Sequence, residues 1–502
     1  MPFKIDKYDF GFLGILFILF FFFNFQNYLF LQPQGVHYIR QTDSLSFVSN
    51  YYENCFHFLE PSLYNLTSMN GQAACEFPII YYFTALLYLV IGEKDFLLKT
   101  IHLLIFYIGL YHTYKLSFLI LKNYFYAFLI PLFLLSSTSL VYYSFNYLPD
   151  IAALGFAFSG WYFICRFKFQ PNLKLLLFST LFFVLSSLLK VTYLVNPIAA
   201  YAMIFTTRFN TKSTSKIEKQ FFLKLTYFYS VSFILVFIWN IYVLYYNSIN
   251  NSIYFTTSIL PVWDLNSFER SFYWKDILGE WYKKYIAETS FHFLVGISLF
   301  TLFTLKKNEN WIKWIIFFLF FGGIFYFILF FIQFRYHDYY FLLFFPLFVF
   351  LLIAFFISFQ NTIQNKWIII LFKVGVLIVV IAGLNYSRIK TKERYDNGCD
   401  TFSRIGFIML NNKDELEKLK ISKKSKVIIG PELSVNGGLY SLHLKGWVIN
   451  SKDEITSQNI EKLKSFGANY FILIDNDSEA QKVIQEKGLK IFQNQDLSVY
   501  QL

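Results

Sequence analysis

The chain has 502 residues, of which 56% are hydrophobic and only 15% are charged. A mean hydropathy of +0.45 excludes an ordinary soluble protein, which could not bury so much apolar surface. The formal net charge of +12 does not indicate nucleic-acid binding, because the Lys and Arg residues fall mainly in short loops between apolar runs and in the polar C-terminal part. The bilayer is therefore the expected solvent for most of the chain.

Apolar runs long enough to cross hydrocarbon as helices recur along most of the sequence. The first run, 8–30, is too long for a signal peptide and no small-residue cleavage site follows it, so we expect a retained span. The other candidate spans are 78–91, 96–119, 124–143, 151–165, 173–189, 191–206, 223–246, 290–305, 311–334, 339–359 and 367–384. The expected fold is an α-helical polytopic membrane protein with about 11 to 13 transmembrane helices.

The basic loops predict the orientation of these spans. Clusters of Lys and Arg lie at 166–174, 208–224, 306–313 and 366, and the positive-inside rule places them in the cytoplasm. Alternation then places outside the membrane the segments 32–77, 149–150, 247–288, 335–338 and the C-terminal tail. Because 78–122 must cross once yet holds two apolar runs, the short run 78–91 is expected to be only partly inserted.

From about residue 385 the composition becomes charged and polar. Alternating apolar residues predict strands at 426–429, 470–474 and 489–492, and amphipathic spacing predicts helices at 414–420 and 460–465. We therefore expect a transmembrane domain over 1–384 and a soluble α/β domain over 385–502 outside the membrane, which holds an acceptor or partner without supplying a catalytic group. The sequence has no GxxxxGK[ST] phosphate loop, which argues against an ATP-driven pump.

The first outer loop, at about 32–77, is unusually long, and long loops in compact proteins are usually functional or disordered. It carries Asp43 near its start and Glu76 at its end, close to the next apolar run. Asp43 is a candidate catalytic base, while the structural alternative is that it caps a helix beginning at Ser44. Cys55 and Cys75 lie in the same loop, and both a disulfide and two separate thiols remain open.

Several segments carry a family resemblance. Arg40-Gln41-Thr42-Asp43, followed by Glu76-Phe77-Pro78-Ile79-Ile80-Tyr81-Tyr82, resembles the first outer loop of the GT-C membrane glycosyltransferases. The most similar group is the bacterial glycosyltransferase family 39 type, related to protein O-mannosyltransferases and aminoarabinose transferases. Further stretches agree in order and predicted side: Leu148-Pro149-Asp150, Lys190-Val191-Thr192, His337-Asp338-Tyr339-Tyr340 and the tail segment 439–447. Many relatives carry a lysine–proline pair before the second span where this chain has Glu76-Phe77-Pro78, so donor handling is expected to differ.

The resemblance implies an inverting transfer with Asp43 as the catalytic base. A hexosyl or pentosyl unit would pass from a polyprenyl-phosphate-linked sugar to a lipid, glycan or protein acceptor, on the outer or periplasmic face of a bacterial inner membrane. One carboxylate suits this chemistry, because a phosphate leaving group needs positive charge more than it needs a general acid. Asp150 and Glu76 are further candidate acids; for Asp150 the alternative is a helix cap after Pro149.

Positive charge for a donor phosphate is available from Arg40, Lys190 and Arg335, although anchoring to lipid headgroups would also explain these residues. His337, Tyr339 and Tyr340 are further candidate donor-binding residues by the resemblance. No cofactor is assigned, and a divalent cation stays open, with Asp43, Glu76, His337 and Asp338 as candidate ligands. For His337 and Asp338, a hydrogen-bonded helix start is the alternative.

Two rival functions make different predictions. A transporter or flippase of lipid-linked glycans should show charged or broken positions near mid-span in two matching halves. The candidate charges of this chain instead gather at the ends of spans, and no half repeats the other. A non-catalytic membrane scaffold would leave the acidic pair in the first outer loop unexplained.

Overall fold

The computed structural model describes residues 6–502 except 55, 212–215, 256–258 and 396–399, and omits the side chains of 207–211, 216–219, 221, 280 and 281. The chain divides into two compact units. Unit 1 comprises Met1–Leu29, Lys99–Asn240 and Thr257–Lys392, and unit 2 comprises Phe30–Leu98, Ile241–Thr256 and Glu393–Leu502. Three of the five boundaries between the units fall inside long helices, at residues 98–99, 240–241 and 392–393.

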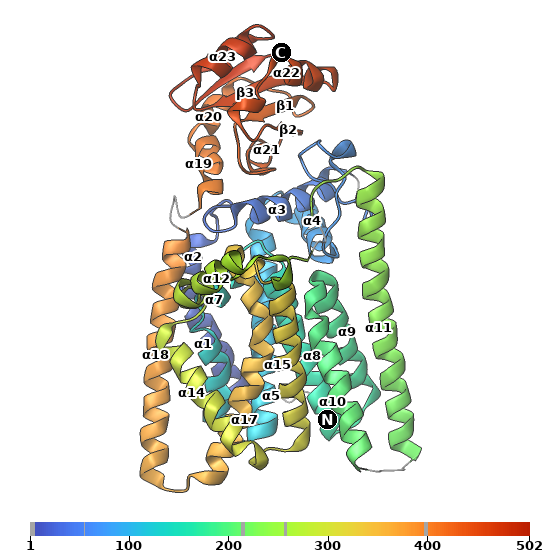
Figure 1. Cartoon of the computed structure of the whole chain (residues 1–502), viewed down its shortest axis with the longest axis vertical. Helices are drawn as coiled ribbons and strands as arrows, with labels where there is room; N and C mark the ends of the chain where they lie inside the picture. Colours follow the sequence, from blue (N-terminus) through green and yellow to red (C-terminus); the bar gives the residue numbers. More distant parts are fainter. Residues whose placement is uncertain (1–5, 55, 212–215, 256–258, 396–399) are drawn as a thin grey trace. The chain divides into compact units, whose positions relative to one another are not determined.

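Unit 1 is helical throughout its described part (Figure 1). Its α-helices are α1 (Lys7–Phe22), α2 (Phe25–Tyr28), α5 (Phe96–Leu121), α6 (Tyr124–Leu134), α7 (Thr138–Ser144), α8 (Asp150–Phe169), α9 (Leu173–Leu189), α10 (Val195–Thr211), α11 (Lys216–Ile249), α12 (Ser267–Asp276), α13 (Tyr282–Tyr285), α14 (Glu288–Thr304), α15 (Asn310–Leu329), α16 (Gln333–Tyr336), α17 (Phe345–Thr362) and α18 (Lys366–Tyr395). Shorter or irregular turns are η2 (Val191–Leu194), η3 (Val262–Asp264), η4 (Ile277–Trp281), η5 (Leu305–Lys307) and η6 (Asp338–Phe344).

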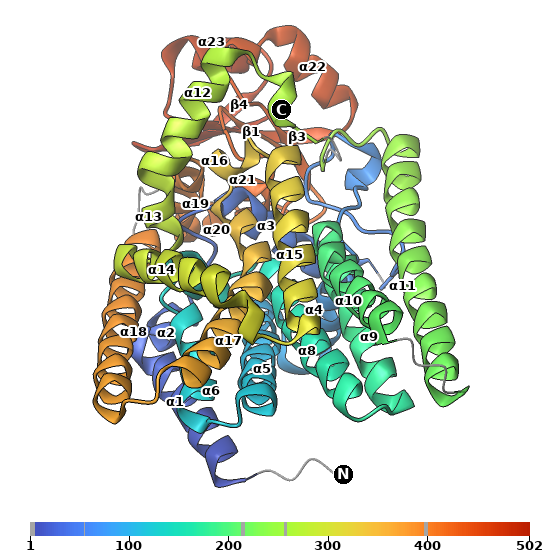
Figure 2. The same ribbon diagram turned by 60° about the horizontal axis from the view of Figure 1, so that its bottom comes forward.

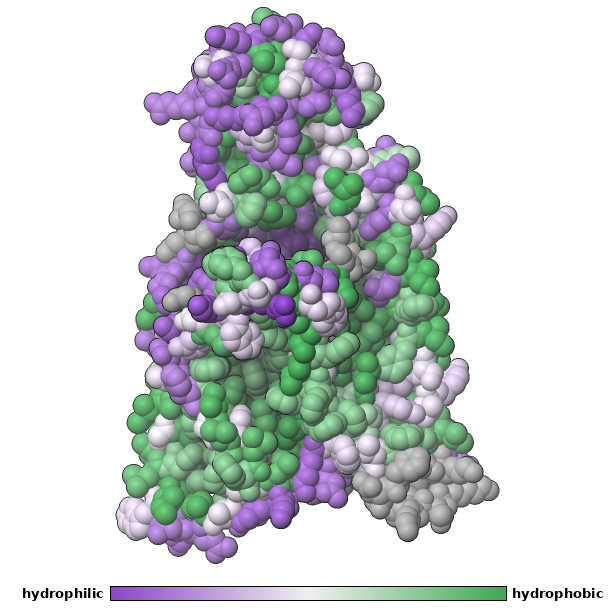
Figure 3. Space-filling model, in the orientation of Figure 1, coloured by the Kyte–Doolittle hydropathy of each residue, from purple (hydrophilic) through white to green (hydrophobic). Residues whose placement is uncertain are grey.

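Among the described residues, six helices are long and apolar enough to cross a membrane, or seven if α6 and α7 count as one bent span. They are Phe96–Leu121, Phe222–Ile249, Glu288–Lys307, Asn310–Leu329, Asp338–Thr362 and Lys366–Tyr395. The expected number of about 11 to 13 is higher because several predicted runs form shorter helices. Figure 3 shows hydrophobic residues covering the helices of unit 1, with hydrophilic residues gathered where α17 turns into α18.

Two predicted continuous spans are broken, and both breaks have a local cause. The run 8–30 divides into α1 and α2 at Asn24, whose φ of 58° lies in the left-handed region. The run 124–143 divides into α6 and α7, which are bent by 82°. Pro131 lies inside α6, and the Ser137 hydroxyl accepts a hydrogen bond from the Leu140 amide to start α7 in a new direction.

Close packing and polar contacts hold the helices of unit 1 together. The backbones of α5 and α8 cross at Gly109 and Gly155, where an added Cβ would lie 2.6 Å from the other helix. Figure 2 shows α14, α15 and α17 lying together. At one end of the unit, Lys115 pairs with Asp9 at 2.8 Å, and the Lys168 ammonium lies 4.8 Å from the ring centre of Trp311. Asp150 begins α8 at the opposite end from Lys168.

Unit 2 combines the first loop with the tail. The loop contributes α3 (Tyr38–Glu53), η1 (Met69–Gly71) and α4 (Ile79–Ile91). The tail contributes the helical segments η7 (Thr401–Ser403), α19 (Arg404–Asn411), α20 (Lys413–Lys418), α21 (Gly437–Leu442), η8 (Lys452–Glu454), α22 (Ser457–Ser465) and α23 (Ser478–Gln485). Its strands are β1 (Lys426–Gly430), β2 (Gly446–Val448), β3 (Ala468–Ile474), β4 (Leu489–Gln493) and β5 (Leu497–Gln501). The predicted strands and helices of the tail are thereby confirmed.

The five strands form one mixed sheet in the order β2-β1-β3-β5-β4. β1 pairs in parallel with β2 and β3, whereas β5 pairs antiparallel with β3 and β4. Ile428, Phe471 and Leu473 lie in the core beneath the sheet, with Ile460 and Ile484 from the flanking helices. This core explains why α22 and α23 are amphipathic.

The first loop continues the edge of this sheet. The amide of Leu66 donates to the carbonyl of Gly446 in the edge strand β2 at 2.7 Å, and the amide of Gly446 donates to the carbonyl of Tyr64 at 3.1 Å. The Leu66 side chain also packs against the core of the tail. Backbone pairing covers an edge that would otherwise present unpaired donors and acceptors. The loop and the tail therefore fold as one unit, although the sequence suggested that the tail is separate.

We predict that Leu66→Ala destabilises the tail by roughly 1 kcal/mol, because the substitution removes a partly buried side chain from its core. Proteolysis of the tail at increasing urea concentration measures this change. Leu59→Ala is the matched control, since Leu59 lies in the same loop and is 53% exposed. Equal resistance of both variants would show that Leu66 does not stabilise the tail.

Candidate functional site

Helix α3 carries the first candidate group. It begins at Tyr38, after His37 in a left-handed conformation with φ of 60°, and Asp43 lies within its second turn. The alternative that Asp43 caps a helix beginning at Ser44 is therefore wrong. Asp43 is 5% exposed, although its helix has low overall hydrophobicity. An interior helical carboxylate buried to this degree needs a charged partner or a functional reason.

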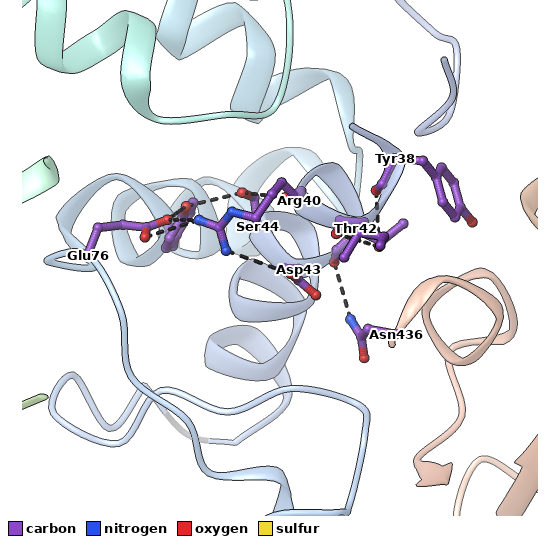
Figure 4. A network of polar contacts seen from close by, with 9 residues as sticks. Tyr38, Arg40, Thr42, Asp43, Ser44, Glu76 and Asn436 are labelled. Atoms are coloured by element: carbon purple, nitrogen blue, oxygen red, sulfur yellow. Dashed lines mark hydrogen bonds and ion pairs between the residues drawn. The ribbon is translucent and has the colours of Figure 1, made fainter. Parts of the chain in front are cut away.

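The partner of Asp43 is the guanidinium of Arg40, one turn earlier on the same helix (Figure 4). Arg40 Nη1 lies 3.6 Å from Asp43 Oδ2, whereas Nη2 donates to both carboxylate oxygens of Glu76 at 2.9 and 3.1 Å. Glu76 also accepts a hydrogen bond from the hydroxyl of Tyr81 in α4. Arg40 therefore donates its short hydrogen bonds to Glu76 and makes a longer contact with Asp43.

Aromatic rings line the same group. The guanidinium carbon of Arg40 lies 5.1 Å from the ring centre of Phe255, which follows α11 in the chain. Phe47, one turn after Asp43, packs on both Phe255 and Tyr81 with ring centres 5.7 and 5.5 Å away. These rings keep water away from the charges and strengthen electrostatic interactions among them.

Burial raises the pKa of Asp43 to about 7. The charge of Arg40 acts in the opposite direction, and the negative charge of Glu76 raises the pKa further. Tyr254, beside Phe255, is a further titratable group that interacts with Asp43. A carboxylate with this pKa is a much stronger base than an exposed aspartate, and it is still substantially ionised near neutral pH.

The second candidate group lies in unit 1. Lys190 ends α9, and its ammonium lies 3.0 Å from Asp150 Oδ1. The same ammonium lies 5.0 and 5.3 Å from the ring centres of Tyr339 and Tyr340 in η6. Asp150 is the first residue of α8 and 4% exposed. The alternative that it caps the helix is wrong, because Pro149 occupies the N-cap position and no side chain caps this end of α8. The buried carboxylate is paired with Lys190 instead. The structure thus brings together residues from three segments that are distant in the sequence.

Of the remaining predicted residues, His337 lies beside this group, whereas Asp338 and Arg335 have other partners. Asp338 opens η6 and accepts a hydrogen bond from the hydroxyl of Tyr143, which agrees with the expected helix start. The imidazole of His337 lies next to the rings of Tyr339 and Tyr340. Arg335 donates to Asp276 at the end of α12 at 2.6 Å. The guanidinium of Arg335, which the sequence suggested as a phosphate ligand, is therefore paired with Asp276.

No metal-binding arrangement is found among the side chains that the structure describes: no three His, Cys, Asp or Glu residues are grouped to hold an ion. The candidate ligands Glu76 and Asp338 are instead engaged by Tyr81 and Tyr143. Cys55 lies outside the described residues, so the choice between a disulfide with Cys75 and two separate thiols stays open.

Four residues of these groups were not found from the sequence: Tyr81, Phe255, Tyr143 and Asp276. Tyr81 lies within the segment that carries the family resemblance, and its spacing from Glu76 offered a usable signal. Tyr143 and Asp276 lie 195 and 59 residues from their partners, so only the fold reveals them.

No protein-family model and no curated protein sequence matches this chain. Solved structures do match. ArnT from Cupriavidus metallidurans bound to undecaprenyl phosphate aligns over 97% of both chains with a TM-score of 0.62 at 11% identity. The apo state of ArnT aligns over 97% of this chain and 96% of that chain, with a TM-score of 0.59 at 10% identity. The apo oligosaccharyltransferase of Archaeoglobus fulgidus gives a TM-score of 0.55 at 10% identity, over 93% of this chain and 70% of that chain.

The chain has the GT-C fold. This confirms the fold class expected from the sequence, including the helical membrane part and the small C-terminal sheet. The alignment with ArnT extends over nearly the whole chain, so the GT-C likeness includes the first loop and the tail as well as the apolar helices. At this level of identity the likeness establishes the fold, and the roles of individual residues have to be argued from their geometry.

The raised pKa of Asp43 predicts how stability depends on pH. Because the folded pKa of about 7 exceeds the model-peptide value of 3.8, the wild-type protein loses stability as pH rises from about 4 to above 7. Asp43→Asn removes this titration. At about pH 8 the variant should therefore have a higher melting temperature than the wild type, and this difference in melting temperature should be smaller at about pH 5. Thermal unfolding in detergent at a series of pH values measures it. A constant gap would show that Asp43 has an ordinary pKa.

Proposed function

We propose that this GT-C protein is a membrane glycosyltransferase that moves a sugar from a polyprenyl-phosphate carrier to an acceptor hydroxyl or amine. The observation that carries the proposal is Asp43, a buried carboxylate with a pKa of about 7 that lies 3.6 Å from a guanidinium. The fold supports it, since one match is a structure of ArnT bound to undecaprenyl phosphate. A polytopic membrane protein is well suited to a donor whose carrier is a lipid.

The proposed reaction is a single displacement with inversion at the anomeric carbon. Asp43 accepts the proton of the acceptor group while the acceptor lone pair forms the new bond to the anomeric carbon. The bond between that carbon and the phosphate oxygen breaks, and its electron pair stays on the phosphate of the carrier. Arg40 keeps Asp43 ionised enough to act, and Glu76 prevents Arg40 from suppressing its basicity.

The departing phosphate requires positive charge, and Lys190 is the proposed source. Its side chain is 25% exposed, and the ammonium lies against Tyr339 and Tyr340, whose hydroxyl groups provide further donors for phosphate oxygens. Asp150 fixes the ammonium in position. Arg335 is a weaker candidate, because its guanidinium is paired with Asp276 and packed 4.6 Å from the ring centre of Phe272.

We also propose that transfer takes place on the outer face of a bacterial inner membrane. The support is the distribution of basic loops, with Lys168, Lys307 and Lys366 at the ends of helices that the positive-inside rule assigns to the cytoplasm. Asp150 begins the helix that ends near Lys168, so it lies on the other side if α8 crosses the membrane. Labelling of single cysteines with an impermeant reagent tests this orientation.

Asp43→Asn should reduce transfer by roughly 10² to 10⁴-fold and leave donor binding intact, because the amide keeps the shape of the carboxylate and removes its basicity. The wild-type rate should rise with pH and level off above about pH 7, since only the ionised Asp43 accepts a proton. Purified protein in proteoliposomes, supplied with a polyprenyl-phosphate sugar, provides the assay. Near-normal transfer by the Asn variant would move the search for the base to Glu76 and Asp150.

Lys190→Met should raise the donor KM by about tenfold or more, because it removes the proposed charge-assisted contact with the phosphate. The single substitution also leaves Asp150 buried without its ion-pair partner, which destabilises the protein. The double variant Lys190→Met, Asp150→Asn removes both charges and separates the two effects. It should regain stability while its donor KM stays high; a wild-type donor KM would exclude Lys190 as a phosphate ligand.

A further inference from the structure

Helix α3 presents two faces to different parts of unit 2. Arg40, Asp43 and Phe47 lie on the face that meets Glu76, Tyr81 and Phe255. Tyr38 and Thr42, one turn apart, lie on a second face that meets the tail. Both residues are fully buried, with 1% and 0% exposure. The tail thus contacts Thr42, the residue directly before Asp43 in the chain.

The tail reaches α3 through the segment 431–437, here named the tail loop. It follows β1 and ends at the first residue of α21. The side-chain amide of Asn436 donates to the carbonyl of Thr42 at 3.4 Å (Figure 4). The ring of Tyr38 packs directly on Gly437, where an added Cβ would lie 2.4 Å from the ring. Two successive residues of the tail loop thus contact two residues of α3 that are one helical turn apart.

The tail loop is itself held firmly on both sides. Asn65 of the first loop donates to the carbonyl of Val435 at 2.6 Å. The carboxyl of Glu432 is buried and accepts a hydrogen bond from the amide of Gly438 at 3.0 Å. Burial raises the pKa of Glu432 to about 8, so it is largely neutral at physiological pH and adds little charge near α3. Hydrogen bonds therefore fix the backbone on both sides of Asn436.

Asn436 is also costly for the fold. Its side chain is 0% exposed, and its Oδ1 has no hydrogen-bond partner among the residues that the structure describes. An apolar residue of similar shape would avoid burying this unpaired acceptor. Among the residues that the structure describes, the side chain of Asn436 makes a polar contact with the first loop at the carbonyl of Thr42, and this contact points to its role.

We propose that Asn436 is a positioning residue for Asp43, which it acts on through the backbone carbonyl of Thr42. The inference rests on the proposed role of Asp43 as the base and extends it, because the tail then takes part in setting the geometry and hydration of that base. Loss of the amide should let α3 shift and admit water beside Thr42. A more hydrated Asp43, facing Arg40, Glu76 and Tyr254 as before, becomes a weaker and less well placed base.

The test compares Asn436→Ala with Tyr440→Phe in the full-length protein. Tyr440 donates to Asp95 at 2.7 Å, so its substitution also removes one hydrogen bond of the tail, but this bond ends on the segment before α5 and not on α3. Asn436→Ala should lower kcat by roughly 10 to 100-fold with little change in the donor KM, and should move the acidic limb of the pH profile to lower pH. Tyr440→Phe should leave both the limb and kcat close to wild type.

Hydrogen exchange of the backbone amides at 42–47 measures how firmly α3 is held and does not require an activity assay. Exchange should be faster in Asn436→Ala than in the wild type and unchanged in Tyr440→Phe. If Asn436→Ala does not fold, Gly437→Ala serves in its place, because its added Cβ displaces Tyr38 on the same face of α3. The same limb shift and faster exchange are then expected.

The outcomes separate the two proposals. A merely structural role of Asn436 would lower activity equally at every pH and leave the midpoint of the limb unchanged, which would overturn the positioning role. Unchanged exchange at 42–47 would also overturn it. If the wild-type protein transfers no sugar, the proposed function fails, and the exchange data still decide whether Asn436 holds α3.

Discussion

The proposed chemistry depends on how the positive charge of Arg40 is shared between the carboxylates of Asp43 and Glu76. Arg40 places Nη2 within hydrogen-bonding distance of both oxygens of Glu76, and it keeps Nη1 at 3.6 Å from Asp43. A direct ion pair would hold Asp43 ionised but weakly basic, whereas burial without Arg40 would keep it protonated. The observed division gives Asp43 a pKa of about 7, which suits proton transfer near neutral pH. Glu76 matters because it competes for Arg40.

The tail contributes to the same electrostatic arrangement by way of α3. The first loop continues the sheet at β2, Leu66 enters the core of the tail, and the tail loop contacts the turn of α3 that precedes Asp43. The turn of α3 that precedes Asp43 is therefore contacted by a segment 394 residues away in the sequence. The proposed role of Asn436 would give the tail a part in chemistry that needs a single carboxylate.

Composition and apolar run length were sufficient to predict the helical membrane part. Alternation was sufficient to predict β1, β3 and β4, whereas β2 and β5 were not predicted. The breaks at Asn24 and after Pro131 were missed because a left-handed residue or a serine cap does not interrupt an apolar run. Asp43 was found through resemblance in the first loop. Asn436 lies 394 residues from Thr42, and nothing in a single sequence connects them. Arg335 was assigned by its charge and its predicted side of the membrane, and its partner Asp276 becomes visible only in the fold.

The central claim is that the chain consumes a polyprenyl-phosphate-linked sugar with Asp43 as the base. The most direct measurement is mass spectrometry of the lipid-linked intermediates in cells whose chromosomal copy carries Asp43→Asn, compared with the wild type. We expect one sugar-bearing polyprenyl phosphate to accumulate in the mutant, because the donor is still made but no longer consumed. The mass of this lipid identifies the sugar. An unchanged pool of lipid-linked sugars, in cells shown to contain the folded variant, would contradict the account.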